Sequence, residues 1–331
     1  MRAVCVREFG PVDSHPIADV SCGTPGPDEV LITVRAIGLN YPDLLMLQGL
    51  YQVRPPLPFV PGRDAAGLVE AVGSGVTQFA PGDRVMCQVP KGAFAEKVIA
   101  PVDRCFSMSP AASFVEAAAM ITPYNTAYVA VTGRSRLAPT EVALVTGASG
   151  SVGIAIIELA KARGARVIAC VSSTEKEEYV RAHGADAVVY THGDNLRETL
   201  RERVAAVNDG KPVDVVFETV GGQVFSAALR TLGFDGRMVV IGFSSTQIPE
   251  VRCNYLLYKN LSVVGAPLDI HFKERAAFMR TGISHLRELF ERKQIRPIVG
   301  RVLPFDDFPA AVRLMADRTV LGRIILEVAA A

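Results

Sequence analysis

The 331-residue chain lacks the paired cysteines of a structural zinc site or a disulfide framework. Its six cysteines never form a C-x-x-C pair, and its five histidines are scattered, with no H-E-x-x-H motif. Zinc ribbons and small secreted folds cluster these residues because few ligands or bridges must hold a small core together. We therefore expect reduced, unpaired cysteines in a cytosolic protein.

An excess of charge and a long apolar run are also missing. Lysine and arginine total 35 and aspartate and glutamate 34, so the net charge is only +1. With this balance the chain lacks the excess of positive charge that is typical of nucleic-acid-binding proteins. No apolar run reaches the roughly 18 residues of a membrane-spanning helix. Charges at Arg2, Arg7 and Glu8 are atypical of a signal peptide. We expect a soluble, cytoplasmic protein with no nucleic-acid or membrane partner.

The first third of the chain reads as β structure. Hydrophobic residues make up 49% and charged residues 21% of the sequence, proportions that are typical of globular proteins, and the length favours two domains. Val30–Ala36 alternates apolar and polar residues as a half-buried strand does. Gly67–Val72 and Asp83–Gln88 are further short runs between Gly/Pro turns. The pattern predicts a compact barrel-like domain.

After about residue 120, strand-like and helix-like segments alternate. This alternation predicts a doubly wound parallel sheet with right-handed crossovers. The expected strands are Thr140–Thr146, Arg166–Val171, Ala187–Tyr190, Val213–Glu218, Met238–Ile241 and Leu261–Gly265. The expected helices are Val152–Arg163, Glu175–His183, Leu196–Val207 and Gln223–Leu232.

The last segment does not extend this alternation. It contains a helical stretch, Lys273–Lys293, and then a strand, a helix and a strand at Val299–Leu303, Phe308–Asp317 and Arg323–Val328. We expect it to return to the first domain. The predicted division is therefore residues 1–122, a nucleotide-binding domain at 123–265, and a return to the first domain at 266–331.

A glycine-rich turn joins the first strand and helix of the parallel sheet. Gly147, Gly150 and Gly153 lie there, so backbone amides at the helix start, Gly150-Ser151-Val152-Gly153, can approach a pyrophosphate. The pattern departs from G-x-G-x-x-G because Ala148 occupies the first glycine position. The flanking strands and helix at the right spacing favour a dinucleotide site over a plain tight turn.

The residues after the second strand distinguish NAD from NADP. NAD-binding proteins commonly carry an acidic residue there for the ribose 2′-hydroxyl, whereas this chain has Ser172, Ser173 and Lys176. Two hydroxyls and an ammonium can hold a 2′-phosphate. Glu175 is an objection, and an N-cap serine with a solvated lysine is the alternative reading. We predict NADPH as the cofactor.

The chain resembles the zinc-free medium-chain dehydrogenase/reductases, in particular the quinone oxidoreductase (zeta-crystallin-like) branch. The resemblance covers essentially the whole length. It implies an α/β fold in which a GroES-like β-barrel catalytic domain, built from both chain ends, carries a Rossmann-type doubly wound parallel sheet domain. The motifs that carry it are Gly38–Tyr51, Phe59–Gly67, Pro81–Val85, Pro123–Tyr128, the glycine loop, Val220–Gly222 and Leu321–Ile324.

The resemblance also implies that catalytic zinc is absent. Zinc-dependent relatives place Cys near position 40 and His-Glu after the glycine of the F-x-x-G segment, whereas this chain has Asn40 and Arg63-Asp64. The four-cysteine structural lobe is missing as well. For Asp64 we expect an ion pair with Arg63 or another cation.

Residue roles follow from the resemblance. Asn40, Asp43 and Tyr51 are the candidate catalytic residues, with Asn40 beside the nicotinamide and Tyr51 able to donate to a substrate carbonyl. A half-buried packing role for Tyr51 and a helix-start role for Asp43 remain alternatives. The further cofactor-binding candidates are Thr126 beside the nicotinamide, Tyr190 beside the 2′-phosphate, and Val220 and Gly242-Phe243-Ser244 at strand ends.

Several functions remain open at this point. The leading hypothesis is NADPH-dependent reduction of a quinone, and the alternative is reduction of an activated C=C bond in an enone, acrylate or enoyl thioester. A non-catalytic NADPH-binding crystallin-like or RNA-binding protein is a third hypothesis, which the net charge disfavours. Relatives pair the edge of the parallel sheet, so we expect a homodimer or a dimer of dimers. Ala266–His271 departs from the family pattern and leaves the substrate undetermined.

Overall fold

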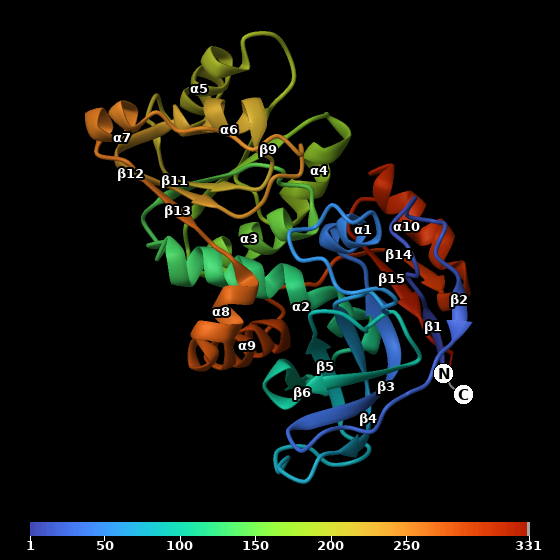
Figure 1. Cartoon of the computed structure of the whole chain (residues 1–331). Coiled ribbons are helices and arrows are strands. Elements are labelled where there is room, and N and C mark those ends of the chain that lie inside the picture. Colours follow the sequence, from blue (N-terminus) through green and yellow to red (C-terminus); the bar gives the residue numbers. More distant parts are fainter. Residues whose placement is uncertain (330–331) are drawn as a thin grey trace. The chain divides into compact units, whose positions relative to one another are not determined.

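A computed structural model of the protein describes residues 1–329 (Figure 1). The chain forms two compact units. One contains Met1–Thr122 and the segment from Pro297 onward, and the other contains Pro123–Arg296. The division falls inside a helix, α2 (Phe114–Tyr128), at Pro123. None of the helices in the described part of the chain is long and apolar enough to cross a membrane.

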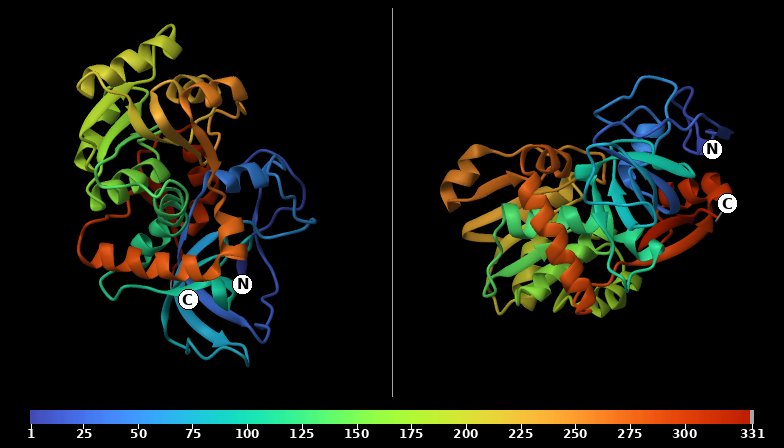
Figure 2. Two further views of the ribbon diagram at one scale, coloured as in Figure 1. Left: turned by 90° about the vertical axis from the view of Figure 1, so that its left-hand side faces the viewer. Right: turned by 90° about the horizontal axis from the view of Figure 1, so that it is seen from below.

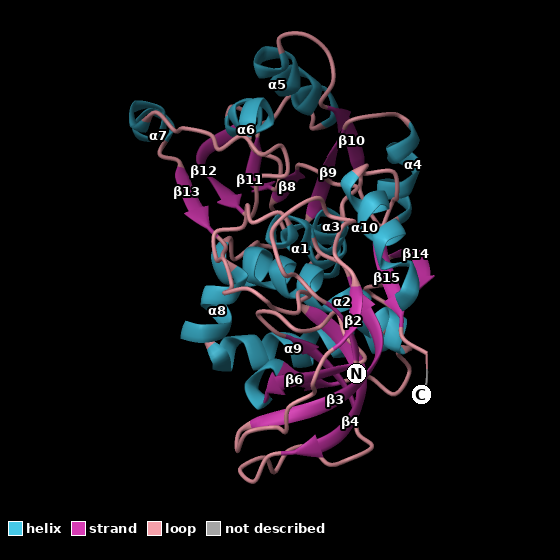
Figure 3. Cartoon of the chain, turned by 45° about the vertical axis from the view of Figure 1, so that its right-hand side comes forward, coloured by secondary structure: helices cyan, strands magenta, loops and turns pink. Residues whose placement is uncertain are grey.

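The second unit contains a six-stranded sheet whose strands all run parallel. Its spatial order is β10-β9-β8-β11-β12-β13, the 3-2-1-4-5-6 arrangement of a Rossmann fold. Magenta strands flanked by cyan helices are visible in this unit in Figure 3. The strands are β8 (Val142–Val145), β9 (Arg166–Val171), β10 (Ala187–Tyr190), β11 (Val213–Glu218), β12 (Leu232–Val240) and β13 (Ser262–Gly265).

Helices connect these strands and cover the sheet. Apolar side chains of the strands and of α5 and α6 form one buried cluster. Continuous apolar strands such as β11 fit a sheet that is covered on both faces. The helices are α3 (Ser151–Ala162), α4 (Glu175–Ala182), α5 (Leu196–Val207), α6 (Gly222–Leu229), α7 (Cys253–Lys259), α8 (Leu268–Glu274) and α9 (Ala276–Glu291).

The first unit is built from both ends of the chain. Its seven-stranded sheet has the order β14-β15-β3-β4-β5-β7, and β6 also pairs with β3. Because β15 pairs with β3, a red and a blue strand lie side by side in Figure 1. The strands are β3 (Glu29–Gly38), β4 (Asp64–Val72), β5 (Arg84–Gln88), β6 (Lys97–Pro101), β7 (Cys105–Ser107), β14 (Val299–Pro304) and β15 (Arg323–Glu327).

Two short helices and a separate pair of strands complete this unit. Helices α1 (Tyr41–Leu47) and α10 (Phe308–Ala316) contribute to its buried core. The strands β1 (Arg2–Val4) and β2 (Ile17–Asp19) pair with each other. The predicted fold class, a GroES-like domain and a Rossmann-type parallel sheet, is confirmed.

The return to the first unit begins later than the sequence predicts. Residues 266–296 group with the parallel-sheet unit, so the return starts at 297 and not at 266. The reason is packing: Phe278 of α9 stacks on Tyr128 of α2, with ring centroids 5.2 Å apart. The expected single helix at Lys273–Lys293 is also divided at Arg275 into α8 and α9. Helix α9 is the long orange helix in both views of Figure 2.

Candidate functional site

The predicted catalytic residues of the first unit lie at the start of α1 and just after it. Asn40 precedes the helix, and its backbone N–H donates to Oδ2 of Asp43 at 2.8 Å. This contact satisfies one of the free N–H groups at the helix start. The helix therefore fixes two of the three predicted catalytic residues, and both are buried.

Arg323 of β15 connects Asn40 to Asp64. Its Nη2 donates to Asn40 Oδ1 at 2.8 Å and also to Asp64 Oδ2. Arg323 and Asp64 are almost completely buried, with 2% and 0% exposure. Gly38 leaves room for this arrangement, since a Cβ there would lie 2.7 Å from Arg323 Nη2. The expected ion pair of Asp64 therefore forms with Arg323.

Thr122 supplies the remaining contacts of Asp64. Its hydroxyl donates to Oδ1 at 2.8 Å, and its backbone N–H donates to Oδ2 at 3.1 Å. A buried carboxylate with a guanidinium and two further donors is well compensated. Asp64 thus holds Arg323 in place.

Tyr51 lies beside a buried arginine. Arg63 Nη1 donates to the Tyr51 hydroxyl oxygen at 3.1 Å, and the guanidinium carbon lies 6.0 Å from the ring centroid. Arg63 is 6% exposed. Tyr51 itself is half-buried and packs against the core of this unit. The sequence pattern identified Tyr51, but not Arg63 as its partner.

Asp43 has a pKa that is shifted from its usual value. Burial raises its pKa to about 7, although the charge of Arg63 and the Asn40 N–H oppose the shift. Its Oδ1 has no hydrogen-bond partner among the described residues. A buried carboxyl group with one free oxygen favours the protonated form. Asp43 can therefore hold a proton near neutral pH.

No metal centre is evident in the described part of the chain. Residues 1–329 contain no group of three or more His, Cys, Asp or Glu side chains placed to hold a metal ion. The positions around Asn40 and Asp64 are instead occupied by the hydrogen bonds of Arg323.

In the second unit, the glycine loop opens α3. Gly150 precedes the helix, and Ser151, Val152 and Gly153 form its first turn. A Cβ at Gly153 would lie 2.5 Å from the carbonyl oxygen of Gly147, so a side chain there would push the helix away from the loop. Close helix–strand packing with free amides at the helix start is the geometry that binds a pyrophosphate.

Glu218, which the sequence reading missed, organises the neighbouring strand ends. This buried residue at the end of β11 accepts hydrogen bonds from the N–H of Val220 at 2.9 Å and of Gly221 at 3.0 Å. The Thr146 hydroxyl donates to it at 3.1 Å. Burial raises its pKa above the usual value. A lone Glu at a strand end gives no sequence signal for this role.

The other predicted strand-end residues form one continuous loop system with Val220. The N–H of Ser244 donates to Thr219 O at 3.1 Å, and that of Ser245 donates to Val220 O at 2.8 Å. Gly242 and Phe243 lie in the same loop after β12. These residues lie at the carboxyl ends of adjacent parallel strands, where ligands bind in such sheets. Thr126 is buried in α2.

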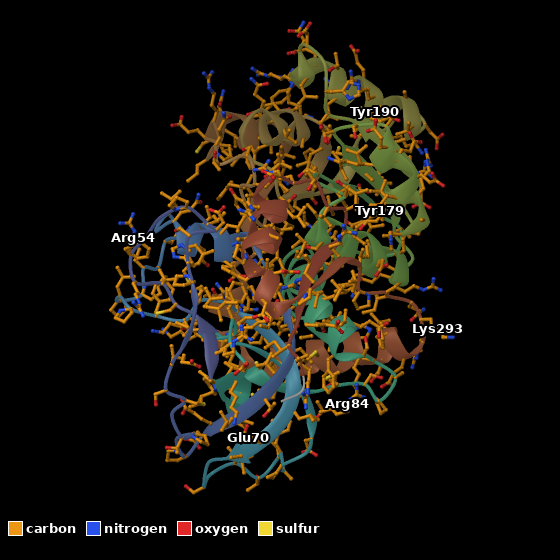
Figure 4. All side chains as sticks on the ribbon, turned by 90° about the vertical axis from the view of Figure 1, so that its right-hand side faces the viewer. Arg54, Glu70, Arg84, Tyr179, Tyr190 and Lys293 are labelled. Carbon is orange, nitrogen blue, oxygen red and sulfur yellow. The ribbon has the colours of Figure 1, made fainter. Side chains whose placement is uncertain are left out.

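The predicted 2′-phosphate residues are brought together in part. Lys176 Nζ donates to Ser172 Oγ at 2.9 Å after β9. A hydrogen bond from the neighbouring Ser173 lowers the pKa of Glu175. The Tyr190 hydroxyl donates to Glu177, so in this arrangement it faces a carboxylate. Tyr190 is labelled in Figure 4, which shows the side chains as sticks.

Comparisons with known proteins agree with this fold. Residues 26–110 match the family model for the alcohol dehydrogenase GroES-like domain, and residues 151–276 match the model for zinc-binding dehydrogenases. The chain is 33% identical to quinone oxidoreductase-like protein 2 homolog of Nematostella vectensis, over 98% of this chain and 88% of that protein.

Two solved structures are similar over nearly the whole chain. A mycobacterial protein in complex with NADPH has a TM-score of 0.92 at 28% identity, covering 99% of this chain and 100% of that one. Escherichia coli quinone oxidoreductase complexed with NADPH has a TM-score of 0.89 at 28% identity, with the same coverage. This chain therefore belongs to the quinone oxidoreductase branch of the medium-chain dehydrogenase/reductases, a family of oxidoreductases that use NAD(P)-type cofactors.

Proposed function

We propose that the protein is an NADPH-dependent oxidoreductase that reduces quinones by hydride transfer. The observation that carries the proposal is the pairing of Lys176 with Ser172 after β9, where an NAD-specific site would carry an acid. The glycine loop at the start of α3 fits the pyrophosphate of such a cofactor. Similarity to two proteins solved with NADPH supports this assignment.

Different residues would bind different parts of the cofactor. Ser151, Val152 and Gly153 would offer amides to the pyrophosphate beside Gly150, whose own N–H donates to Gly147 O. Ser172, Ser173 and Lys176 would hold the 2′-phosphate. Tyr190 would border the adenosine once Glu177 turns away. Thr126, Val220, Gly242, Phe243 and Ser244 would contact the nicotinamide half. When bound, NADPH supplies a hydride, and this chain supplies binding and orientation.

The first unit would supply the polar groups for the substrate. A quinone that accepts a hydride develops negative charge on oxygen, and a fixed donor binds that oxygen more strongly in the transition state. Tyr51 offers a hydroxyl and Asn40 an amide N–H. Asp43, whose pKa is raised to about 7 by burial, holds the Asn40 backbone and can retain a proton.

Reduction of an activated C=C bond is the second candidate. Its carbonyl becomes an enolate, which stabilises negative charge less well than a hydroquinone anion does. The oxygen of the enolate therefore needs stronger hydrogen-bond donors. The buried guanidinium of Arg63 on the Tyr51 oxygen favours this chemistry, because a charged neighbour strengthens the donor. The substrate would then be an enone, an acrylate or an enoyl thioester.

A parallel assay distinguishes the two candidates. NADPH oxidation should be followed with 1,4-benzoquinone, 2-cyclohexenone, methacrylate and crotonyl thioester at matched concentrations, with NADH as the cofactor control. Turnover with benzoquinone well above the alkenes supports the first candidate, and the reverse order supports the second. NADPH that binds but is oxidised by none of them would leave only a binding function.

We also propose a metal-free, cytoplasmic homodimer or dimer of dimers. The supporting observations are the Asn40–Arg323 contact at the position where zinc-dependent relatives carry a ligand, and the edge position of β13.

A further inference from the structure

Two buried arginines hold the oxygens of the two residues that would face the substrate. Arg63 Nη1 lies 3.1 Å from the Tyr51 hydroxyl oxygen, and Arg323 Nη2 lies 2.8 Å from Asn40 Oδ1. We propose that Arg63 and Arg323 are positioning residues that fix Tyr51 and Asn40 as hydrogen-bond donors, so that the site selects substrates with a carbonyl oxygen as acceptor. The inference rests on the proposed function, because it assigns the substrate class of that same site.

The contact with Arg63 determines where the Tyr51 hydrogen can point. A guanidinium carries only donors, so the Tyr51 oxygen must be the acceptor in this pair. A phenol has one hydrogen, and no atom of the described residues accepts it within hydrogen-bond distance. The half-buried Tyr51 therefore keeps its hydrogen for a bound molecule.

The contact with Arg323 settles the orientation of the Asn40 amide. An amide oxygen and nitrogen are interchangeable in shape, but only the oxygen can accept from a guanidinium. Oδ1 must face Arg323, and Nδ2 must face the other way. Nδ2 has one long contact, 3.4 Å to Gly38 O. Since an amide nitrogen carries two hydrogens, at least one is left to donate.

Tyr51 and Asn40 are thus both oriented to donate a hydrogen bond to a bound molecule. A carbonyl oxygen, or the oxyanion that it becomes, finds a donor at Tyr51 and at Asn40. An alcohol that must donate its own hydrogen would have to share an oxygen that already accepts from an arginine. The arrangement favours carbonyl-activated acceptors and disfavours alcohols as binding partners.

A double-mutant cycle tests the link between Arg63 and Tyr51. The variants are Arg63→Met, Tyr51→Phe and both together, assayed with 2-cyclohexenone and NADPH. We expect Arg63→Met to lower kcat about tenfold, as loss of a charge-assisted hydrogen bond does. In the Tyr51→Phe background it should cause little further loss of kcat, because the hydroxyl through which Arg63 is proposed to act is gone. Arg63→Lys, which keeps a donor, should recover part of the loss.

The matched control is Arg7→Met, which removes the same charge from an exposed position in the same unit. It should leave kcat unchanged. NADPH affinity, measured by fluorescence titration, should change by less than about twofold in the Arg63 variants. A purely structural role of Arg63 would instead lower stability and cofactor affinity together.

The roles of Arg63 and Tyr51 can also be tested by a binding measurement, which does not depend on turnover. 4-Nitrophenol changes its absorbance when it ionises, so titration reports which form the protein binds. We expect the phenolate to bind in preference to the neutral phenol. Arg63→Met and Tyr51→Phe should each weaken it about tenfold, and the double variant no further. Arg323→Lys and Asn40→Ala should form a second non-additive pair.

The outcomes separate the two proposals. If no quinone or alkene is reduced but the phenolate pattern holds, the proposed function fails and this inference stands. If the protein is an active reductase and the Arg63 and Tyr51 losses add, or if phenol and phenolate bind equally, the inference is overturned. Should Arg63→Met fail to fold, the cycle is run with Arg63→Lys, where additive losses again overturn it.

Discussion

The guanidinium of Arg323 donates to Oδ1 of Asn40 across 283 residues of sequence. The contact exists because β15, near the end of the chain, pairs with β3, which ends two residues before Asn40. Arg323 also binds Asp64. Both chain ends therefore build one buried polar cluster, and loss of Arg323 removes a partner from both Asn40 and Asp64.

Removal of Arg323 should destabilise the protein strongly. Arg323→Met leaves Asp64 buried without its cation, and breaking a buried ion pair on one side costs about 3–5 kcal/mol. Urea unfolding followed by circular dichroism measures the change. The control Arg301→Met removes an exposed arginine from the adjacent strand β14 and should cost about 0.5 kcal/mol or less. Equal, small losses in both variants would contradict the role of Arg323.

Stability should also depend on the protonation of Asp43. Burial raises the pKa of Asp43 to about 7, from a usual value of 3.8. Between these values the native state binds more protons than the unfolded state, so this group makes stability fall as the pH rises. Asp43→Asn cannot ionise, so its unfolding free energy should decline less than that of wild type between about pH 4 and 7. Parallel curves in urea unfolding across this range would argue against a raised pKa.

The sequence predicts the parallel sheet well. The ranges of β9, β10, β11 and α5 coincide with the expected segments. These segments have regular apolar patterns and lie between turns, so local periodicity and burial favour the same structure. The glycine loop was found for the same reason, since the strand and helix on each side of it are both evident.

The sequence does not predict long-range polar contacts or short helices. Arg323, Thr122 and Glu218 act through partners that are distant in sequence or through backbone groups, which no local pattern records. The sequence offers a helix-start role for Asp43 as one alternative but does not predict the extent of helix α1, because seven residues with a proline near the start give too short a repeat. The predicted domain boundary at 266 was wrong because α9 packs on α2 of the parallel-sheet unit. The sequence pattern did not predict α2, so it offered no partner for α9 in that unit.

Cofactor preference can be tested at Lys176. If its ammonium binds the 2′-phosphate, Lys176→Ala removes a charge-assisted contact and should weaken NADPH about ten- to a hundredfold. NADH, which has no 2′-phosphate, should bind as before. Lys211→Ala removes an exposed lysine of the same unit and is the control. Fluorescence titration gives both affinities, and equal losses for NADPH and NADH would assign Lys176 a role in the fold.

Zinc content tests the metal-free proposal. The resemblance places Asn40 and Arg63-Asp64 at the positions of the ligands in zinc-dependent relatives, and Asp64 already binds Arg323 and Thr122. Elemental analysis of the purified protein should find far less than one zinc per chain, and chelators should leave reductase activity intact. One tightly held zinc whose removal abolishes activity would overturn the proposal.

Assembly through the edge of the parallel sheet gives the last prediction. β13 is an edge strand, and exposed edges invite pairing with another chain. Helix α7, which leads into β13, carries Leu257 and Tyr258 with 86% and 84% exposure. Such apolar side chains are unfavourable in water, and a second copy that pairs its β13 across a two-fold axis would cover them.

We therefore expect light scattering to give a dimer, or a tetramer built from dimers, at micromolar concentration. A Leu257→Glu/Tyr258→Glu variant places two like charges in the contact and should shift the protein toward monomer, because buried unpaired charges are costly. Val53→Glu, at an exposed apolar position of the other unit, should leave the assembly unchanged. A wild-type monomer would contradict the predicted assembly, and a double variant that assembles like wild type would place the contact elsewhere. Since the variant lies outside the glycine loop and the Ser172–Lys176 pair, NADPH affinity per chain should be retained, which separates loss of assembly from loss of folding.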